Sequence, residues 1–510
     1  MDEQIKPQNN ATLTDWIAVA AGAAGALMAT LDVSITNSAL PQIQGAVGAT
    51  GTEGTWITTG YMMSEIVMIP LVAWLTKWLG LRNLLVMNAT LFIVFSFLCG
   101  FSSSLPFLIA ARVGQGFCGG AMIPTAQSIV RTRLPLHQLP VGMTAFGLTV
   151  IMGPLLGPVV GGWLTENANW SWCFFINGPI CLVMLVMLLC GLPAEKIKSH
   201  EFVKADWLGI AGLALGLSTL IAILEEGQRE NWFESTMICR LSVISVTGLL
   251  MIIMSQIYVE KPVLNLRLFR NKSFSSVIII IFVTGIVLYG IAYLVPQFLS
   301  HIAGYNAEQS GGVLLLAGIP ALLLMYILPR LVTKVDIRLI VIPGLVLFAI
   351  SCFMDTSLSI QSSGDSFVFS QLVRGTAQML CMMPLNQAAM AAVTKEESGD
   401  AAGLYNMARN LGGAIGLALI GTFLDRREVF HNTVLRESVH ASSPVAQSKF
   451  EALAGASVGG DSHVISAAQL VKMIAQQSSV LAYNETYFVL MVSILLCIPM
   501  AFLLKRPQKK

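Results

Sequence analysis

The stretch SSVIIIIFVTGIVLYGIAYLVPQF, residues 275–298, contains no charged side chain. The hydrocarbon core of a bilayer is about 30 Å thick, and a helix needs roughly 20 residues to cross it. Because no water is available there to hydrogen-bond a free backbone group, a helix is the spanning element at this segment length. Residues 275–298 are therefore predicted to form a transmembrane helix.

Stretches of the same kind recur along the whole chain. Hydrophobic residues make up 55% of the 510 residues and charged residues 11%, whereas about 25% of the residues of a soluble domain are charged. The sequence therefore predicts an all-α polytopic membrane protein with fourteen transmembrane helices. We place these spans at residues 14–36, 54–76, 84–102, 105–129, 140–162, 171–191, 206–224, 237–257, 275–298, 310–330, 337–355, 367–393, 401–424 and 486–504.

The lysines and arginines are distributed unevenly between the loops. If the N-terminus is cytoplasmic, 20 of the 30 basic residues fall in cytoplasmic segments, and the short outer loops carry two. Because cytoplasmic loops of membrane proteins are enriched in lysine and arginine, this bias predicts that both termini are cytoplasmic. The net charge of +2 implies no general attraction to nucleic acid.

One predicted loop is much longer than the others. Residues 425–485 form an outward-facing insert with two helix-like runs, EVFHNTVLRESV and SAAQLVKMIAQQSSVLAY, around a middle rich in glycine and serine. A loop of this length is usually functional or disordered. The sequence leaves open whether the insert is a mobile cap or a docking surface for a partner.

Among the ionisable side chains within predicted spans, four stand out: Asp32, Glu65, Arg112 and Arg374. Arg409 also falls within a span. A charge at mid-membrane costs roughly 2.5–3.5 kcal/mol on insertion scales, so each is a candidate functional residue. The two carboxylates can take up protons, as coupling to a proton gradient requires, whereas an arginine keeps its charge and can only pair with a carboxylate or polarise it. The alternative is a permanent structural ion pair or a position near a helix end, and for Arg374 the two interpretations carry equal weight.

The fifth predicted span contains the most specific local pattern, TVIMGPLLGPVVGGWL, residues 149–164. Its glycines recur every four residues, which lets a neighbouring helix approach backbone to backbone. Its prolines remove two amide donors and bend the helix. Such a helix suits a rocking contact between two halves. The residues of the pattern are Gly153, Pro154, Gly157, Pro158, Gly161 and Gly162.

Residues typical of enzyme sites are not grouped along the chain. The nine cysteines are scattered, mostly inside apolar segments, and show no paired or metal-type spacing. No nucleophile–base pair, metal cluster or soluble signalling domain stands out. A membrane-embedded enzyme or sensor is therefore disfavoured, and no metal or cofactor is expected.

Several of these segments resemble one known family. GPLLGPVVGG, residues 153–162, is similar to the antiporter motif of drug exporters in the major facilitator superfamily, and LDVSITNSALP, residues 31–41, to the first-span signature of its 14-span drug:proton antiporters. ARVGQGFCGGAMIP, residues 111–124, resembles the fourth-span motif of that superfamily. The segments NWSWCFFINGPI, EEGQRENWF and GLYNMARNLGGAIG are similar to sequences of EmrB-type exporters within this branch. The resemblance covers nearly the whole chain.

One loop departs from the superfamily pattern. The segment after the second span usually carries a glycine, an acid and basic residues that act as a cytoplasmic latch. Here it reads WLTKWLGLRNL, residues 74–84, with Lys77 and Arg82 but no acid. A charge-relay latch at this loop is therefore in doubt, although EmrB-type members often lack the acid as well.

The resemblance implies an architecture of two six-helix bundles with substrate bound between them near mid-membrane. The first bundle would comprise residues 1–191 and the second residues 275–510, which include the insert 425–485. Residues 192–274 would contribute two inserted transmembrane helices with basic cytoplasmic connectors.

The resemblance also implies proton-driven export of amphiphilic or toxic small molecules across the inner membrane. Asp32 would be the main proton site, with Glu65 and Arg112, and the antiporter motif would carry the rocking. EmrB-type exporters pass substrate to a periplasmic adaptor and an outer-membrane channel, which we expect near the 425–485 insert. The pocket residues implied are Asn37, Tyr61, Met62, Gln115, Arg374 and Gln378.

A proton-coupled importer of a small organic solute is the alternative function. It would share the fold, Asp32 and Arg112, but it would have no use for the repeated glycine–proline pattern of the fifth span. The sequence does not identify the transported compound, the proton stoichiometry or the oligomeric state.

Overall fold

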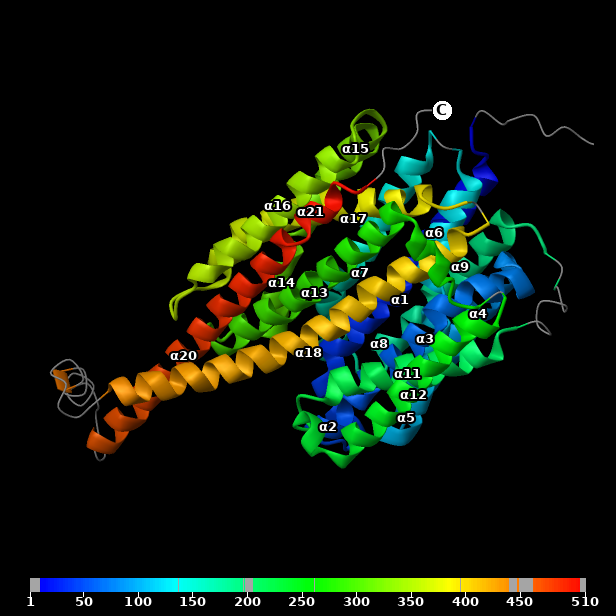
Figure 1. The fold of residues 1–510 in the computed structure, drawn as a ribbon. Coiled ribbons are helices and arrows are strands. Elements are labelled where there is room, and N and C mark those ends of the chain that lie inside the picture. The colour runs from blue at the N-terminus through cyan, green and yellow to red at the C-terminus, as the bar shows by residue number, and fades with distance from the viewer. Residues whose placement is uncertain are drawn as a thin grey trace, which may run out of the picture.

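The computed structural model describes residues 10–135, 137–195, 197, 205–260, 262–394, 396–439, 447–448 and 462–504. Within these ranges the chain forms helices and connecting loops, without a strand (Figure 1). The helices that precede residue 192 are α1 Leu13–Val47, α2 Gly51–Gly54, α3 Trp56–Leu79, α4 Leu81–Gly100, α5 Leu105–Gly119, α6 Met122–Arg133, α7 Leu139–Asn167, α8 Trp172–Phe175 and α9 Asn177–Gly191. We refer to these helices as the first half.

The helices that follow in the chain are α11 Trp207–Glu226, η1 Trp232–Glu234, α12 Thr236–Tyr258, η2 Leu266–Arg270, α13 Lys272–His301, α14 Ala307–Leu315, α15 Gly318–Lys334, α16 Arg338–Met354, η3 Asp355–Ser357, η4 Gly364–Phe367, α17 Val368–Ala391, α18 Ser398–Ser438, α20 Ser462–Leu495 and α21 Ile498–Ala501. We refer to α13 through α21 as the second half. Helices α11 and α12 lie between the two halves in the chain.

Each of the fourteen predicted spans coincides with helix. In the described part of the chain, ten helices are long and apolar enough to cross a membrane, and the bent helix α7 makes eleven. The three other predicted spans differ for local reasons. Two of them are interrupted, between α5 and α6 and between α14 and α15, and α17 carries many polar side chains. The all-α polytopic membrane fold is therefore confirmed, and the exact number of fourteen spans stays a prediction.

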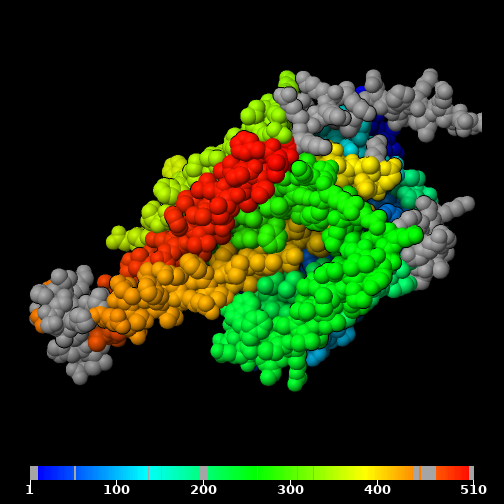
Figure 2. Space-filling model, viewed as in Figure 1, coloured from blue at the N-terminus to red at the C-terminus, as the bar shows by residue number. Residues whose placement is uncertain are grey.

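The molecule has two faces that polar contacts help to define. The terminal face, as we call it, is the one where α1 begins and α21 ends. There Arg133 of α6 lies 3.9 Å from Asp15 of α1, and Arg338 of α16 donates to the carbonyl of Leu504 at 2.6 Å. The hairpin face is the opposite one, where α18 and α20 project together from the body (Figures 1 and 2).

Helix α18 is longer than the span predicted from the sequence. Its 41 residues span about 60 Å at 1.5 Å per residue, roughly twice the thickness of the hydrocarbon core. The predicted span 401–424 and the helix-like run that follows it are thus parts of one continuous helix, which pairs with α20 beyond the body as a hairpin. Arg427 of α18 donates to both carboxylate oxygens of Glu485, and Ser479 of α20 donates to Glu428 at 2.6 Å.

The hairpin includes parts of the predicted insert 425–485. Both helix-like runs of that insert are helical where the structure describes them. The intervening residues 440–446 and 449–461, with most of the glycine- and serine-rich middle, lie outside the described residues.

Two helices between the halves form a close pair. A Cβ atom on Gly248 of α12 would overlap the backbone of Gly216 of α11, so these two helices touch along glycine. Helix α11 packs in turn against α3 of the first half and α18 of the second. It also hydrogen-bonds to α3 near the hairpin face, where the Thr59 hydroxyl donates to Glu226 at 2.9 Å.

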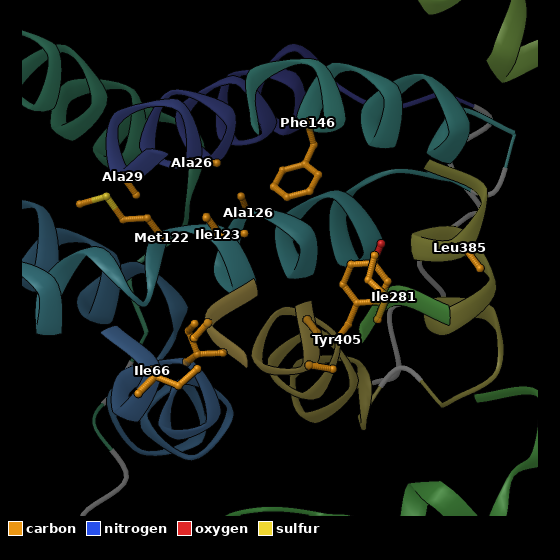
Figure 3. Packing of buried hydrophobic residues seen from close by; sticks show 14 of the residues in the cluster. Ala26, Ala29, Ile66, Met122, Ile123, Ala126, Phe146, Ile281, Leu385 and Tyr405 are labelled. Carbon is orange, nitrogen blue, oxygen red and sulfur yellow. The ribbon is translucent and has the colours of Figure 1, made fainter. Parts of the chain in front are cut away.

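The two halves meet through small and polar residues as well as apolar ones. A Cβ atom on Gly403 of α18 would lie 3.2 Å from the Ile69 carbonyl of α3. The buried amide of Asn406 donates to Gln127 of α6 at 2.7 Å. Figure 3 shows buried side chains of both halves in this part of the core, among them Phe146 of α7 and Tyr405 of α18. A site built between the halves is therefore enclosed by helices of both.

Candidate functional site

Asp32 of α1 is the centre of a fully buried polar cluster in the first half. One carboxylate oxygen accepts from Arg112 Nη1 at 2.6 Å. The other accepts from Gln115 Nε2 at 2.9 Å and from Asn177 Nδ2 at 2.5 Å. All four side chains have no exposed surface. The structure therefore brings the predicted pair Asp32 and Arg112 into direct contact and surrounds the carboxylate with donors.

The helix α5 presents Arg112 and Gln115 together. The two residues are three apart in sequence, so their side chains lie on one face of the helix. Arg112 Nη1 also donates to Gln115 Oε1 at 2.8 Å, and Arg112 Nε donates to the carbonyl of Ile57 at 3.3 Å. The ring of Tyr61 lies 4.3 Å from the guanidinium carbon. An aromatic face stabilises a desolvated cation, so Tyr61 contributes to the environment of Arg112.

Asn177 reaches the cluster because the sixth predicted span is broken. Helix α8 ends at Phe175 and α9 begins at Asn177, and Pro179 has no amide hydrogen to donate within the new first turn. The hydroxyl of Ser96 in α4 accepts from Asn177 at 2.8 Å and donates to the carbonyl of Phe174 at 2.8 Å. Sequence reasoning missed Asn177 and Ser96 as members of this site. The segment NWSWCFFINGPI was the available signal for Asn177.

The cluster balances one negative charge with one positive charge away from water. Uncompensated charges are costly inside a membrane, whereas a hydrogen-bonded pair is tolerated. A proton on Asp32 would remove the negative charge and leave the Arg112 guanidinium without its counter-charge. The arrangement can therefore convert the binding of one proton into a change in the interactions of α1 with α5 and α9.

Glu65 of α3 occupies a separate position between the halves. Its side chain is partly buried and lies within electrostatic range of Arg409, Arg112 and Asp32. No ion pair within 4.0 Å joins Glu65 to a basic group of the described residues. The predicted proton-coupling residues thus form one contacting pair, Asp32 with Arg112, and one carboxylate outside that contact.

The glycines of the fifth span contact α1 at regular intervals. Cβ atoms on Gly153 and Gly157 of α7 would overlap Thr30 and Ser34 of α1, respectively, and a Cβ atom on Gly161 would overlap Ser38. The contacting residues recur every four positions on both helices, so the two backbones lie close together along a seam. A Cβ atom on Gly162 would meet nothing within 4 Å, so this glycine is not part of the seam.

The prolines of the same motif have distinct surroundings. Because Pro158 lacks an amide hydrogen, it cannot donate to the carbonyl of Pro154 four residues earlier. The hydroxyl of Ser34 in α1 donates to that carbonyl instead, at 3.2 Å. Helix α7 bends by 41° close to Pro154. Pro158 also lies next to Gly311 of α14, so α7 touches the second half on another side.

The six residues expected to form the substrate pocket do not lie together. Tyr61 and Gln115 belong to the Asp32 cluster described above, whereas Asn37 of α1 is exposed and Met62 of α3 is partly buried. Gln378 of α17 is buried and donates to the sulfur of Met382 at 3.7 Å. Their role in substrate binding stays a prediction.

Arg374, the sixth of these residues, forms an ion pair within the second half. Its Nη2 atom donates to Asp355 of η3 at 2.5 Å, and both side chains are buried. Sequence reasoning missed Asp355, which lies at the edge of a predicted span and thus gave no signal of deep burial. The contact fits the structural interpretation, in which Arg374 is one member of a buried ion pair.

A small cavity lies between the halves. It has a volume of about 30 Å³ and is lined from the first half by α6 and α7 and from the second by α17 and α18. Its lining residues are Gln127, Met143, Phe146, Gly147, Val150, Met379, Met382, Met383, Asn386, Tyr405 and Arg409. A larger cavity of about 550 Å³ lies at the hairpin face around Tyr305, Gln309 and Asp365. That cavity is lined by the second half alone and lies away from the Asp32 cluster.

Lys77 has an acidic partner although its own loop has none. Its amine lies 3.6 Å from the carboxylate of Asp400, in the first turn of α18. The acid that the loop 74–84 lacks is therefore present on the facing helix of the second half. Lys77 is 53% exposed, and an exposed pair of this kind contributes about 0–1 kcal/mol.

Metal ligation has no basis among the described residues, where no group of three or more His, Cys, Asp and Glu side chains is close enough to hold an ion.

Comparison with known proteins identifies the family of the chain. Residues 22–417 match the family model described as Major Facilitator Superfamily. The chain belongs to this superfamily. It is 31% identical over 474 residues to the colistin resistance protein EmrB of Acinetobacter baumannii, covering 92% of this chain and 93% of the relative. It is 30% identical over 488 residues to the multidrug export protein EmrB of Escherichia coli K12, covering 95% of this chain and 94% of the relative.

These similarities confirm the predicted resemblance to EmrB-type exporters, and this member of the major facilitator superfamily is a transport protein rather than an enzyme. A solved structure with a similar fold is the human organic anion transporter MFSD10 (TETRAN). It superposes with a TM-score of 0.60 at 14% sequence identity and covers 94% of this chain and 99% of that chain. The similarity at this identity concerns the fold alone.

Two glycines of the fifth span should respond differently to alanine. We expect Gly157→Ala to destabilise the protein by about 1–3 kcal/mol, because the added methyl overlaps Ser34 in a closely packed seam. Gly162→Ala is the matched control, since its methyl meets no neighbour. Thermal unfolding in one detergent measures both effects. Equal melting temperatures for the two variants would contradict the assignment of the seam.

The buried ion pair of Asp32 and Arg112 leads to a second prediction. Asp32→Asn should lower the free energy of unfolding by about 3–5 kcal/mol, because it leaves the buried Arg112 without a counter-charge. The double variant Asp32→Asn, Arg112→Gln should recover most of that loss, since neither charge remains. Thermal unfolding of the three proteins tests this. A single variant as stable as the wild type would show that the pair is not ionised in the resting protein.

Proposed function

We propose that the protein exports amphiphilic or toxic small molecules in exchange for protons. The observation that carries the proposal is the position of Asp32 on α1. Asp32 lies between Leu31 and Ser34, both of which adjoin glycines of the α7 seam. A change in the charge of Asp32 therefore acts on the same helix that forms the seam. Coupling between proton binding and helix movement requires such a connection.

The proposed cycle assigns a separate task to each part of the site. Asp32 binds and releases the proton, and Arg112 pairs with the carboxylate when it is charged. Gln115 and Asn177 orient the carboxylate through both of its oxygens. The α1–α7 seam passes a movement of α1 to α7, which contacts α14 of the second half at Pro158 and Gly311. Rocking of the two halves against each other then exposes the space between them to each side of the membrane in turn.

We further propose that the protein lies in the inner membrane with its terminal face in the cytoplasm. The excess of lysine and arginine in the loops of that face supports this orientation. In this arrangement the first half, residues 1–191, and the second half, residues 275–510, are two six-helix bundles, with residues 192–274 inserted between them. The packing of α11 against α3 and α18 fits helices inserted at the edge of both bundles.

The transported compounds proposed here are varied and amphiphilic. The relatives are named for multidrug export and for colistin resistance. Four methionines, at positions 143, 379, 382 and 383, line the cavity between the halves. Methionine side chains repack easily, so they suit ligands of varied shape.

We propose that the hairpin of α18 and α20 docks a periplasmic adaptor, which in turn contacts an outer-membrane channel. Interhelical contacts of Arg427 and Glu428 hold its described base together, which favours a docking surface over a mobile cap. Apolar side chains are exposed on it, with Val429 at 67% and Phe430 at 50%. Exposed apolar groups outside the membrane indicate an interaction surface.

Transport in inverted membrane vesicles tests the export mechanism. With an imposed pH gradient, acid inside, the wild type should accumulate a fluorescent amphiphile, and the accumulation should disappear when an ionophore collapses the gradient. Asp32→Asn should lose at least nine-tenths of this transport, because its side chain cannot take up the proton. Membrane insertion of the variant, checked by immunoblot, is the control. Gradient-driven accumulation by Asp32→Asn would refute the proton site.

Photo-crosslinking tests the docking surface. Benzoylphenylalanine at Val429 should yield a crosslink to a membrane-anchored periplasmic adaptor in intact cells. The same probe at Phe233 is the matched control, since that side chain is 70% exposed and lies on the same face but in η1. Crosslinks to the adaptor from both positions, or from neither, would argue against the hairpin as the specific contact.

A further inference from the structure

Arg409 of α18 differs from the two other arginines found within predicted spans. Arg112 and Arg374 each have a carboxylate partner, at 2.6 Å and 2.5 Å. Arg409 is 5% exposed, but no carboxylate of the described residues lies within 4.0 Å of it. Arg409 donates to the neighbouring amide oxygen of Asn410, at 3.4 Å from Nε and 3.3 Å from Nη2, and it also hydrogen-bonds to the Tyr289 hydroxyl. A buried cation is therefore left without a counter-charge in contact.

The cavity beside Arg409 lies between the halves. The lining side chains other than Arg409 are uncharged, and most of them are apolar or contain sulfur. Phe146 and Tyr405 line it from opposite halves, and Figure 3 shows both side chains in this region. The space is positively charged at one point and mostly apolar elsewhere, with Gln127 and Asn386 as polar exceptions. This combination is the complement of an amphiphilic anion.

The charged and titratable groups around Arg409 come from several helices. Glu65 of α3 lies within electrostatic range without contact. Tyr289 of α13 hydrogen-bonds to Asn410 at 3.3 Å, and Glu225 of α11 interacts electrostatically with Tyr289. Glu65 is thus the carboxylate that can offset the Arg409 charge from a distance. It does not occupy the hydrogen-bonding positions of the guanidinium.

A guanidinium binds a carboxylate through two parallel hydrogen bonds, and such charge-assisted bonds are strong where water is excluded. We propose that Arg409 binds the anionic head group of an amphiphile whose apolar part packs against Met143, Phe146 and Met379. This inference rests on the proposed export function and specifies its substrate class. The cavity of about 30 Å³ has room for about one water molecule. Because its walls belong to both halves, separation of the halves enlarges it.

Equilibrium binding to the purified protein in nanodiscs of phosphatidylcholine tests this site without transport. The probe is dansyl-undecanoate, a fluorescent fatty acid, and its methyl ester is the uncharged match. The wild type should bind the acid at least tenfold more tightly than the ester. Arg409→Gln should weaken binding of the acid about tenfold or more, the loss expected for charge-assisted hydrogen bonds, and leave the ester unchanged. Equal binding of the acid by both proteins would overturn the proposal.

Two further variants distinguish the effect of losing the Arg409 charge from a general disruption of the fold. Arg409→Lys keeps the positive charge and should bind the acid more tightly than Arg409→Gln does. Glu65→Gln removes the opposing charge in the same region and should bind the acid at least as tightly as the wild type. A loss of affinity in Glu65→Gln equal to that in Arg409→Gln would indicate general disruption and count against the site.

A lipid head group carries the same anionic chemistry. In nanodiscs that contain phosphatidylglycerol, competition with the probe in the wild type would show that lipid phosphate also binds at Arg409. Absence of competition would restrict the site to the fatty acid probe.

The binding assay tests the site at Arg409, and the vesicle assay tests the proposed export function, so the two claims can be refuted independently. Charge-selective binding that depends on Arg409, without gradient-driven transport, would contradict the proposed function and leave the site standing. Gradient-driven transport, together with binding of the acid that does not depend on Arg409, would support the proposed function and contradict the site.

Discussion

An arginine keeps its charge at any physiological pH, so its burial in a membrane protein is costly unless other groups neutralise and hydrogen-bond it. Arg112 meets this condition through Asp32, which is itself held by Gln115 and Asn177. The requirement fixes α1, α5 and α9 relative to one another, since each helix supplies part of the cluster. The arrangement of the first half therefore depends on the contacts of one carboxylate.

Helix α1 takes part in two kinds of contact. Asp32 points to the charged cluster, and the nearby Thr30 and Ser34 adjoin the glycines of α7. Close packing along glycine leaves no room for adjustment of single side chains. A shift of α1 therefore moves the whole seam. In the proposed mechanism, this rigid connection would carry a local event at the carboxylate to α7, which also contacts the second half at Gly311.

The arginines of the second half have different partners from that of Arg112. Arg374 follows the start of α17 at Val368 by six residues, and Arg112 follows the start of α5 at Leu105 by seven. The two arginines are thus placed at similar depths in comparable helices. Asp355, however, comes from η3, directly after α16, and not from the first helix of its half. Arg409 has no carboxylate in contact among the described residues, and it faces the space between the halves. The three arginines thus have three different environments in one fold.

The sequence by itself determined the membrane fold and the ionisable residues buried in it. Hydropathy is a local property, so each predicted span could be recognised from its own residues, and Asp32, Arg112 and Arg374 stood out against apolar neighbours. The spacing of Gly153, Gly157 and Gly161 likewise indicated a close helix contact, because four-residue intervals place them on one face.

Only the tertiary structure decided which groups meet. It assigned Asn177 to Asp32, Asp355 to Arg374 and Asp400 to Lys77, pairs that are separated by 145, 19 and more than 300 residues. It also joined the predicted span 401–424 and the helix-like run after it into one helix, α18, because pairing with α20 stabilises helix outside the apolar stretch. Partners of this kind depend on how the helices pack, and helix packing is set by contacts between distant segments that no local pattern records.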